Sequence, residues 1–204
     1  MLFDSMVSSI LNYGSEIWGF HRAHDIEIIF NRFCRFILKV GRNAPVAFLC
    51  GELGHFPMYV LRRFRILKYW LNILSKKPNI VFNVYTLLYQ DAINGKSNWV
   101  SSVRDLLCNL GLNYVWMSQD VSNISFDFIK QRIIDQFLQQ WSASLYDCEK
   151  LSVYRSIKVD FCLEKYFNFC NDVSLFSKLR SGTLKLNIEQ GRFTNTPIEN
   201  YVSV

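Results

Sequence analysis

The apolar residues of this chain recur every three to four positions over most of its length, which is the spacing of an amphipathic helix. Only residues 184–188 alternate with a period of two, as a half-buried strand does. We therefore expect a mainly α fold, an irregular multi-helix bundle with little or no β-strand near the C-terminus. The pattern predicts helices over 25–40, 57–74, 80–94, 99–110 and 124–145, shorter ones near 150–157, 161–169 and 173–179, and a helical turn near 47–51.

Composition limits the class of protein. Half of the 204 residues are apolar, enough for one good core or two small ones. The longest uncharged stretch, 106–119, has 14 residues, below the roughly 18–20 that a membrane span needs, so no membrane partner is expected. The N-terminus has no secretory pattern, which favours an intracellular, cytoplasmic or nuclear protein. Six cysteines without a C-x-x-C pair predict buried free thiols.

The motifs that carry common chemistries are missing. The sequence has no phosphate-binding glycine loop, no nucleophile elbow, no H-E-x-x-H and no two adjacent carboxylates. His21 and His24 have no convincing third and fourth metal ligand. We therefore predict no catalytic residue, no metal and no cofactor. An enzyme would need a constellation that these motifs do not describe.

Positive charge is concentrated at one end of the sequence. Residues 1–78 carry 11 Lys/Arg against 5 Asp/Glu, whereas residues 79–204 carry 12 of each. In the helix predicted over 25–40, Asp25 is the expected N-cap and Gly41 the residue after the helix. The basic residues fall opposite an apolar stripe of Ile26, Ile29, Phe30, Phe33, Phe36, Ile37 and Val40. A second basic edge follows in the helix predicted over 57–74. The candidate phosphate contacts are Arg32, Arg35, Lys39, Arg42, Arg62, Arg65 and Lys68.

These two helices would form a positive groove if they packed antiparallel through their apolar faces. Aromatic residues beside cations are typical of a single-stranded nucleic-acid site, and Trp18, Tyr59 and Tyr69 are the weaker stacking candidates. The alternative is a basic face that is merely solvated. Glu52 is expected to pair with Arg62 or Arg63, and Arg63, inside the apolar sector, to need a carboxylate or a path to water.

Several short stretches, taken in order, resemble a known family. They are 2–4 with 13–19 (YGSEIWG), 33–38 (FCRFIL), 51–57 (GELGHFP), 66–70 (ILKYW), Trp99, 111–116 and 186–193 (LNIEQGRF). Together they resemble the region after the palm in reverse transcriptases of non-LTR, LINE-type retrotransposons, where a Y-G-[SA]-E-x-W stretch starts the thumb-like helices. The likeness covers residues 2–193.

The resemblance implies a C-terminal fragment of such a polymerase. The family's endonuclease and its Y/F-x-D-D palm motif are not in this sequence, and residues 194–197 stand where many members carry a zinc knuckle. The resemblance therefore does not imply polymerase activity for this chain. It does imply binding of template RNA or of an RNA–DNA hybrid. The implied organisation is a basic thumb-like region over 1–78, a helical linker over 79–193 and a tail over 194–204, with a further possible boundary at 120–123.

Two functions follow as hypotheses. The first is a non-catalytic helical module that binds RNA or an RNA–DNA hybrid, with the polymerase core of a related element as a possible partner. The second is a degenerate transposon-derived helical protein with only a structural or protein-interaction role. Residues 1–20 are the segment most expected to expose apolar side chains.

Overall fold

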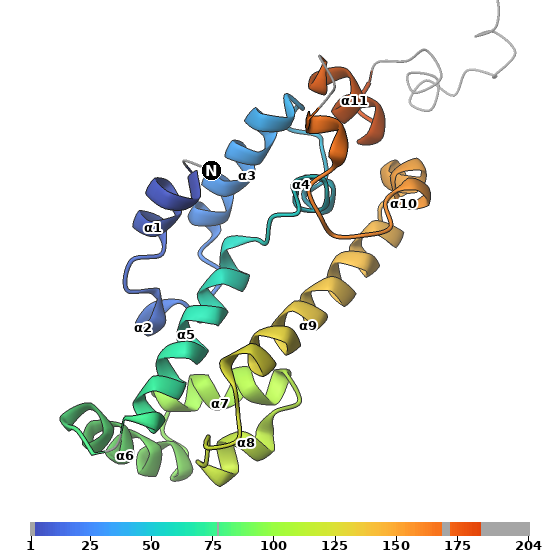
Figure 1. The fold of residues 1–204 in the computed structure, drawn as a ribbon. Coiled ribbons are helices and arrows are strands. Elements are labelled where there is room, and N and C mark those ends of the chain that lie inside the picture. Colours follow the sequence, from blue (N-terminus) through green and yellow to red (C-terminus); the bar gives the residue numbers. More distant parts are fainter. Residues whose placement is uncertain (1–2, 77, 169–171, 185–204) are drawn as a thin grey trace, which may run out of the picture. The chain divides into compact units, whose positions relative to one another are not determined.

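The computed structural model describes residues 3–76, 78–168 and 172–184 (Figure 1). These residues form eleven α-helices and no strand, so the mainly α class is confirmed. A single isolated β-bridge joins Leu53 to Leu163. The alternating stretch 184–188 lies, except for Leu184, outside the described residues.

The chain divides into two compact units, and each combines segments that are far apart in the sequence. The first comprises Met1–Glu27 with Phe56–Gln139, and the second Ile28–His55 with Gln140–Val204. The expected boundary at residue 78 lies inside the first unit. Two helices, α3 (His24–Leu38) and α9 (Phe126–Tyr146), contribute residues to both units.

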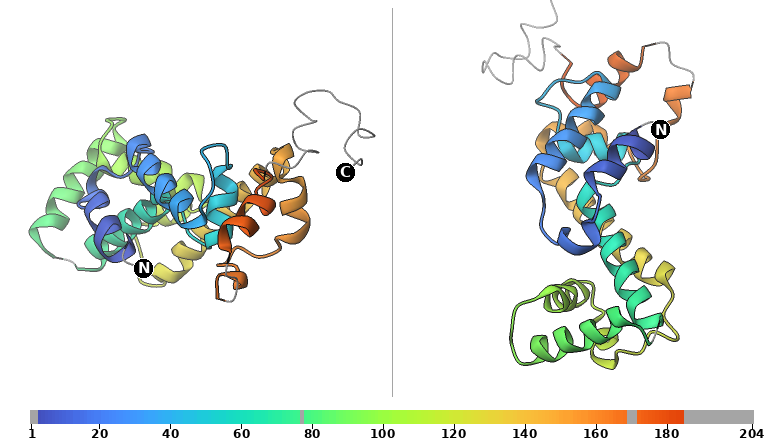
Figure 2. Two further views of the ribbon diagram at one scale, coloured as in Figure 1. Left: turned by 90° about the horizontal axis from the view of Figure 1, so that it is seen from above. Right: turned by 90° about the vertical axis from the view of Figure 1, so that its left-hand side faces the viewer.

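The first unit is organised around α5 (Met58–Ser75), the longest helix that belongs wholly to it. Helix α2 (Ser15–Trp18) packs on α5. Near the C-terminal end of α5 lie α6 (Ile80–Ile93), α7 (Trp99–Asn109) and α8 (Asn113–Ser118) (Figures 1 and 2). The Trp99 indole donates to the Glu16 carbonyl at 2.9 Å, joining α7 to α2. Besides these helices and its parts of α3 and α9, the unit contains a π-helical turn (Phe3–Val7) and α1 (Ser8–Leu11).

The second unit packs around a short buried helix, α4. Phe48 of α4 contacts the Tyr154 ring edge-on at 4.9 Å, and the Trp141 indole donates to the Ala47 carbonyl at 2.8 Å. The unit contains α4 (Val46–Leu53), α10 (Ser152–Ile157), α11 (Val173–Arg180) and 3-10 turns at Glu149–Leu151 and Lys165–Asn168, besides its parts of α3 and α9.

Local sequence signals explain where several helices begin. Asn79 accepts a hydrogen bond from the Phe82 amide at the start of α6, and Asn98 forms a capping box with Ser101 at the start of α7. Gly95 and Gly111, which follow these two helices, have positive φ angles of 84° and 72°.

The first unit also contains a buried chain of hydrogen bonds. The Trp70 indole donates to the Tyr85 hydroxyl, and that hydroxyl donates to Gln119. Burial raises the pKa of Tyr85 to about 12.

Candidate nucleic-acid interface

The end of α3 and the turn that follows it carry four of the seven predicted phosphate contacts, but the buried face of the helix matches the predicted one only in part. Phe30, Cys34 and Leu38, spaced by four residues, are fully buried, whereas Phe36 of the predicted apolar stripe is 81% exposed. Ile29 of that stripe is also exposed. The predicted stripe was therefore right at Phe30 and Val40 and wrong at Ile29 and Phe36. The buried stripe runs through Cys34 and Leu38, so Phe36 lies on the outer surface with the cations.

The termini of α3 also differ from the prediction. The helix begins at His24, so Asp25 lies in its first turn instead of capping it. It ends because Lys39 adopts a left-handed conformation with a φ angle of 51°, and the Val40 amide then bonds to the Arg35 carbonyl at 3.1 Å. Gly41, predicted for this role, is not among the residues with positive φ. The reversal at Lys39 turns the chain back, and Arg42 follows on the returning segment.

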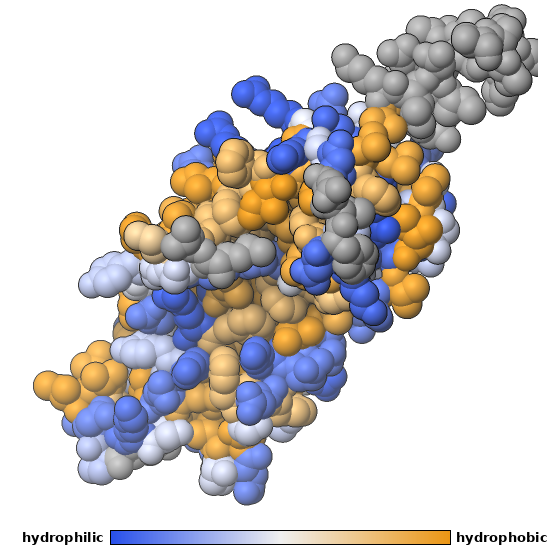
Figure 3. All heavy atoms as spheres, turned by 45° about the horizontal axis from the view of Figure 1, so that its top comes forward, coloured by the Kyte–Doolittle hydropathy of each residue, from blue (hydrophilic) through white to orange (hydrophobic). Residues whose placement is uncertain are grey.

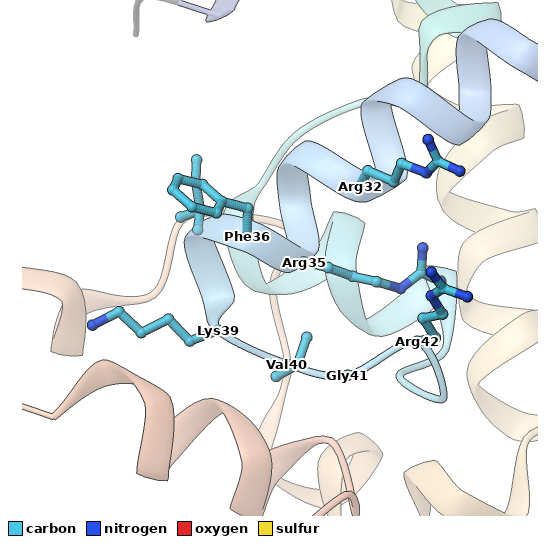
Figure 4. Close-up of a pocket in the computed structure, with 8 residues that line it drawn as sticks. Arg32, Arg35, Phe36, Lys39, Val40, Gly41 and Arg42 are labelled. Atoms are coloured by element: carbon cyan, nitrogen blue, oxygen red, sulfur yellow. The ribbon is translucent and has the colours of Figure 1, made fainter.

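An open depression of about 620 Å³ lies at this reversal. The side chains of Arg32, Arg35 and Arg42 point to the same side of the helix end, with the guanidinium groups of Arg35 and Arg42 directed toward each other (Figure 4). Lys39 lines the same depression but points away from the three arginines. The remaining lining residues are Phe36, Ile37, Val40 and Gly41.

No carboxylate lines this depression among the described residues. Arg35 donates to the Ala44 carbonyl at 3.3 Å, which fixes its orientation, and its buried Nε has no hydrogen-bond partner among the described residues. The side chains of Arg32, Lys39 and Arg42 form no ion pair or hydrogen bond with a described residue. Clustered cations without counter-charges repel each other and create a positive potential that attracts anions.

A second depression of about 470 Å³ continues from the first, because Gly41 and Arg42 line both. Its other lining residues are Asn43, Lys178, Thr183 and Leu184, and no carboxylate is among them. Lys178 of α11 therefore adds a fifth cation to the same surface. Sequence patterning did not find Lys178 because 136 positions separate it from Arg42. We call the surface formed by Arg32, Arg35, Phe36, Lys39, Arg42 and Lys178 the basic surface.

The structure removes Arg62 from the expected phosphate contacts. Its side chain is fully buried in the first unit, where Nη2 donates to the Glu27 carboxylate at 3.1 Å. Burial lowers its pKa, and the contact with Glu27 opposes that shift. Glu27 also accepts hydrogen bonds from the Met58 and Tyr59 amides, at 3.2 and 2.7 Å. Arg62 and Glu27 therefore fix the start of α5.

Arg65 and Lys68 of α5 are exposed, whereas Arg63 is half-buried. Arg65 donates to the Asn12 carbonyl at 2.8 Å, and Lys68 lies 5.7 Å from the centre of the Phe126 ring. Both belong to the first unit, whereas the basic surface belongs to the second. The expected groove between the two basic helices thus stays a prediction. Arg63 has the neutral Gln136 as its hydrogen-bond partner at 3.0 Å, instead of a carboxylate.

The predicted stacking residues already have partners. The Tyr59 ring lies beneath Arg22 at 4.5 Å and Arg63 at 5.3 Å, and Tyr69 packs edge-on against Trp99 at 5.8 Å. Trp18 is partly exposed, but its indole donates to the Tyr13 carbonyl at 3.0 Å. Phe36, which was predicted to be core, is the more accessible ring, and the described residues form no ring contact with it.

A second charged cluster in the second unit stabilises the fold. Glu52 is fully buried and accepts from Arg180 Nε at 2.7 Å and from the Tyr166 hydroxyl at 2.8 Å, so the expected pair with Arg62 or Arg63 was wrong. Arg180 also pairs with Glu164, which pairs with the buried Lys158. Burial raises the pKa of Tyr166 above its usual range. Because each charge in this cluster has a partner of opposite sign, it ties α4 to α11.

Other functional sites receive no support from the described residues. No group of three His, Cys, Asp or Glu side chains among them could hold a metal ion, and none of their helices is both long and apolar enough to cross a membrane. The cysteines are less buried than predicted, since only Cys34 and Cys50 are buried whereas Cys108 and Cys162 are exposed. Cys170 lies outside the described residues.

Comparisons of the chain with protein-family models, with curated proteins and with solved structures find no match. The resemblance to LINE-type reverse transcriptases therefore stays a hypothesis based on the ordered stretches of the sequence.

Proposed function

We propose that this chain is a non-catalytic helical module that binds RNA or an RNA–DNA hybrid through the sugar–phosphate backbone. The observation that carries the proposal is the basic surface, where Arg32, Arg35 and Arg42 come together and no described carboxylate lines the depression. The resemblance to the post-palm region of LINE-type reverse transcriptases supports it. An intracellular location, in the cytoplasm or nucleus, and a polymerase core of a related element as partner belong to the same proposal.

The proposed mechanism is electrostatic. Each guanidinium group offers planar, paired N–H donors that match phosphate oxygens, and each phosphate contact releases a counterion from the nucleic acid. Such contacts position the strand without reading its sequence. If Arg32, Arg35, Arg42 and Lys178 each neutralise one phosphate of a single strand, the logarithm of the binding constant falls with that of salt with a slope of about −3.

A second candidate is the transposon-derived protein with only a structural or protein-interaction role. The observation that favours it is the exposed apolar side chains at the N-terminus, where Ile10 and Tyr13 are 75% and 84% exposed. Figure 3 shows other apolar side chains reaching the surface between hydrophilic ones. A face of this kind is typical of a protein-binding site.

The test is fluorescence anisotropy of the purified chain with a labelled RNA hairpin carrying a single-stranded overhang, titrated over a range of salt concentrations. The variant Arg32→Glu, Arg35→Glu, Arg42→Glu is compared with the matched control Lys76→Glu, Lys130→Glu, Lys150→Glu, which makes the same charge change at exposed positions. We expect the first variant to lose binding and the control to keep most of it.

Two results would reject the proposal. If both variants weaken binding equally, net charge is responsible and the basic surface is only a solvated face. If the parent chain binds no tighter than an unrelated protein of equal charge, the protein-interaction role stands instead. A third variant, Arg65→Glu with Lys68→Glu, measures whether the first unit contributes.

A further inference from the structure

We propose that the basic surface binds an unpaired stretch of RNA, with one base stacked on Phe36 and the adjoining phosphates held by the arginines around it. This inference rests on the proposed function and narrows the ligand to a single strand. Phosphate contacts alone would equally allow binding of a duplex or an RNA–DNA hybrid.

The position of Phe36 is the first argument. Its ring is 81% exposed, although burying a phenylalanine side chain stabilises a protein by about 1.5–3 kcal/mol. Phe36 follows Arg32 by four residues, so the two side chains are neighbours on one face of α3. Both line the depression that also contains Arg35, Lys39 and Arg42. A flat apolar ring surrounded by cations is the combination that single-stranded nucleic-acid sites use.

The accessibility of bases is the second argument. In an A-form duplex the base faces are stacked on each other, and side chains reach only the edges, sugars and phosphates. A ring that stacks on a base face therefore needs a base that is splayed out of the helix or unpaired. Phe36 offers such a contact. An intact RNA duplex or RNA–DNA hybrid has no free base that could stack on its ring.

The path of the cations is the third argument. The two depressions share Gly41 and Arg42, so a strand that leaves Phe36 along the arginines continues toward Lys178 without meeting a described carboxylate. The surface thus provides several successive phosphate positions beside one stacking position. That arrangement favours a flexible strand that adapts to the turn at Lys39 over a stiff double helix.

The experiment measures the affinities of four labelled ligands at one salt concentration. They are an unstructured oligoribonucleotide, the same strand paired with complementary RNA, the same strand paired with complementary DNA, and an abasic strand of equal length. The variants are Phe36→Ala, Phe36→Trp and, as a matched exposed aromatic of the second unit, Tyr146→Ala. Because Phe36 is exposed, we expect Phe36→Ala to fold, and circular dichroism is the measurement that checks its folding.

We expect the single strand to bind at least tenfold tighter than either duplex. Phe36→Ala should weaken single-strand binding by about 5- to 150-fold, the range of one base–aromatic stack. Phe36→Trp should retain it, Tyr146→Ala should leave it unchanged, and the abasic strand should respond to neither substitution at Phe36.

Failure of this inference is distinguishable from failure of the proposed function. Equal binding of single strand and duplexes, unaffected by Phe36→Ala but lost on reversing Arg32, Arg35 and Arg42, overturns the stacking role and leaves backbone binding in place. If Phe36→Ala weakens binding of all four ligands equally, the stacking role is also overturned. The ring would then affect only the phosphate contacts, which all four ligands share. Absence of binding to every ligand overturns both, and leaves Phe36 as part of a protein-binding surface.

Discussion

The second unit packs tightly at Gly51, where there is no room for a side chain. A Cβ atom at this position would lie 2.6 Å from the Trp141 ring and 2.8 Å from the Tyr154 hydroxyl. Neither neighbour is free to move, since Trp141 donates to Ala47 and the Tyr154 ring packs on Phe48. Gly51, in the segment where the sequence predicts a helical turn, is thus the point where α9 and α10 approach α4 closely.

We expect Gly51→Ala to lower the free energy of unfolding by about 1–3 kcal/mol, the usual effect of overpacking a core. Urea denaturation followed by tryptophan fluorescence measures it. The matched control is Gly41→Ala, because no atom of the described residues lies within 4 Å of a Cβ there. Equal stability of Gly51→Ala and the parent chain would show that the two rings do not approach α4 as described.

Tyr85 links stability to pH through its buried hydroxyl. Its pKa of about 12 in the folded chain exceeds the ordinary value of 10, so the folded state keeps a proton that the unfolded state releases. The stabilisation is complete below pH 10 and is lost as pH rises toward 12. Between pH 9.5 and pH 11 we expect the parent chain to lose about 1 kcal/mol more stability than Tyr85→Phe. Parallel slopes for the two proteins in urea titrations would contradict this.

Sequence patterning fails at single residues of α3 and α5 for a physical reason. A helical wheel ranks positions by hydropathy, and the cysteine at 34 contributed less to the predicted stripe than the phenylalanines at 33 and 36. The buried face is decided instead by what packs against the helix. Arg62 fails for a similar reason, because its partner Glu27 precedes it by 35 residues on another helix.

At the scale of one element, Glu27 determines how α5 begins. Its carboxylate accepts from the Met58 and Tyr59 amides, where the helix dipole favours a negative charge, and neutralises the buried Arg62. Glu27→Gln keeps an acceptor but removes the charge. We expect it to lower the free energy of unfolding by about 2–4 kcal/mol, since it leaves a buried cation uncompensated.

The control for Glu27→Gln is Asp91→Asn, which breaks the exposed pair with Lys96 in the same unit. Exposed pairs contribute little, so we expect a change below about 1 kcal/mol. Replacing Arg62 with Met in the Glu27→Gln background should restore most of the lost stability. If the double variant is no more stable than the single one, the uncompensated charge is not the cause.

Most long helices were predictable because their ends carry local signals. Asn79, Asn98, Gly95 and Gly111 mark boundaries by hydrogen bonding and backbone conformation, and the predicted ends lie within a few residues of the observed ones. Helices α1, α2 and α8, of four to six residues, are too short to show a periodic pattern. They form because tertiary contacts hold them, which the sequence does not display.

At the scale of the molecule, the two units recombine distant segments, so no shift of composition along the chain marks them. The concentration of positive charge in residues 1–78 includes the cations of α3 but does not indicate what surrounds them. Lys178, which lies on the basic surface, comes from the part of the sequence with no excess charge. Arg62, which comes from the basic part, forms a buried ion pair with Glu27. Charge along the sequence therefore predicts an anion-binding tendency, while folding selects which cations share a surface.

The exposed apolar side chains of the N-terminal helices predict that the chain associates with itself. Ile10, Tyr13 and Ile17 are 75%, 84% and 55% exposed, as the sequence led us to expect for residues 1–20. Contiguous apolar surface that remains in water drives contact with a further apolar surface. We expect the sedimentation coefficient of the parent chain to rise with concentration, and the variant Ile10→Ser, Tyr13→Ser, Ile17→Ser to abolish that rise.

The matched control replaces three exposed apolar residues of the second unit, Val153, Ile157 and Val159, with serine. If this control suppresses association as strongly, general surface hydrophobicity is responsible and the N-terminal face has no special role. If only the N-terminal variant does so, while binding RNA as the parent chain does, protein contact and nucleic-acid binding use separate surfaces. The two candidate functions would then describe two faces of one molecule instead of two alternatives.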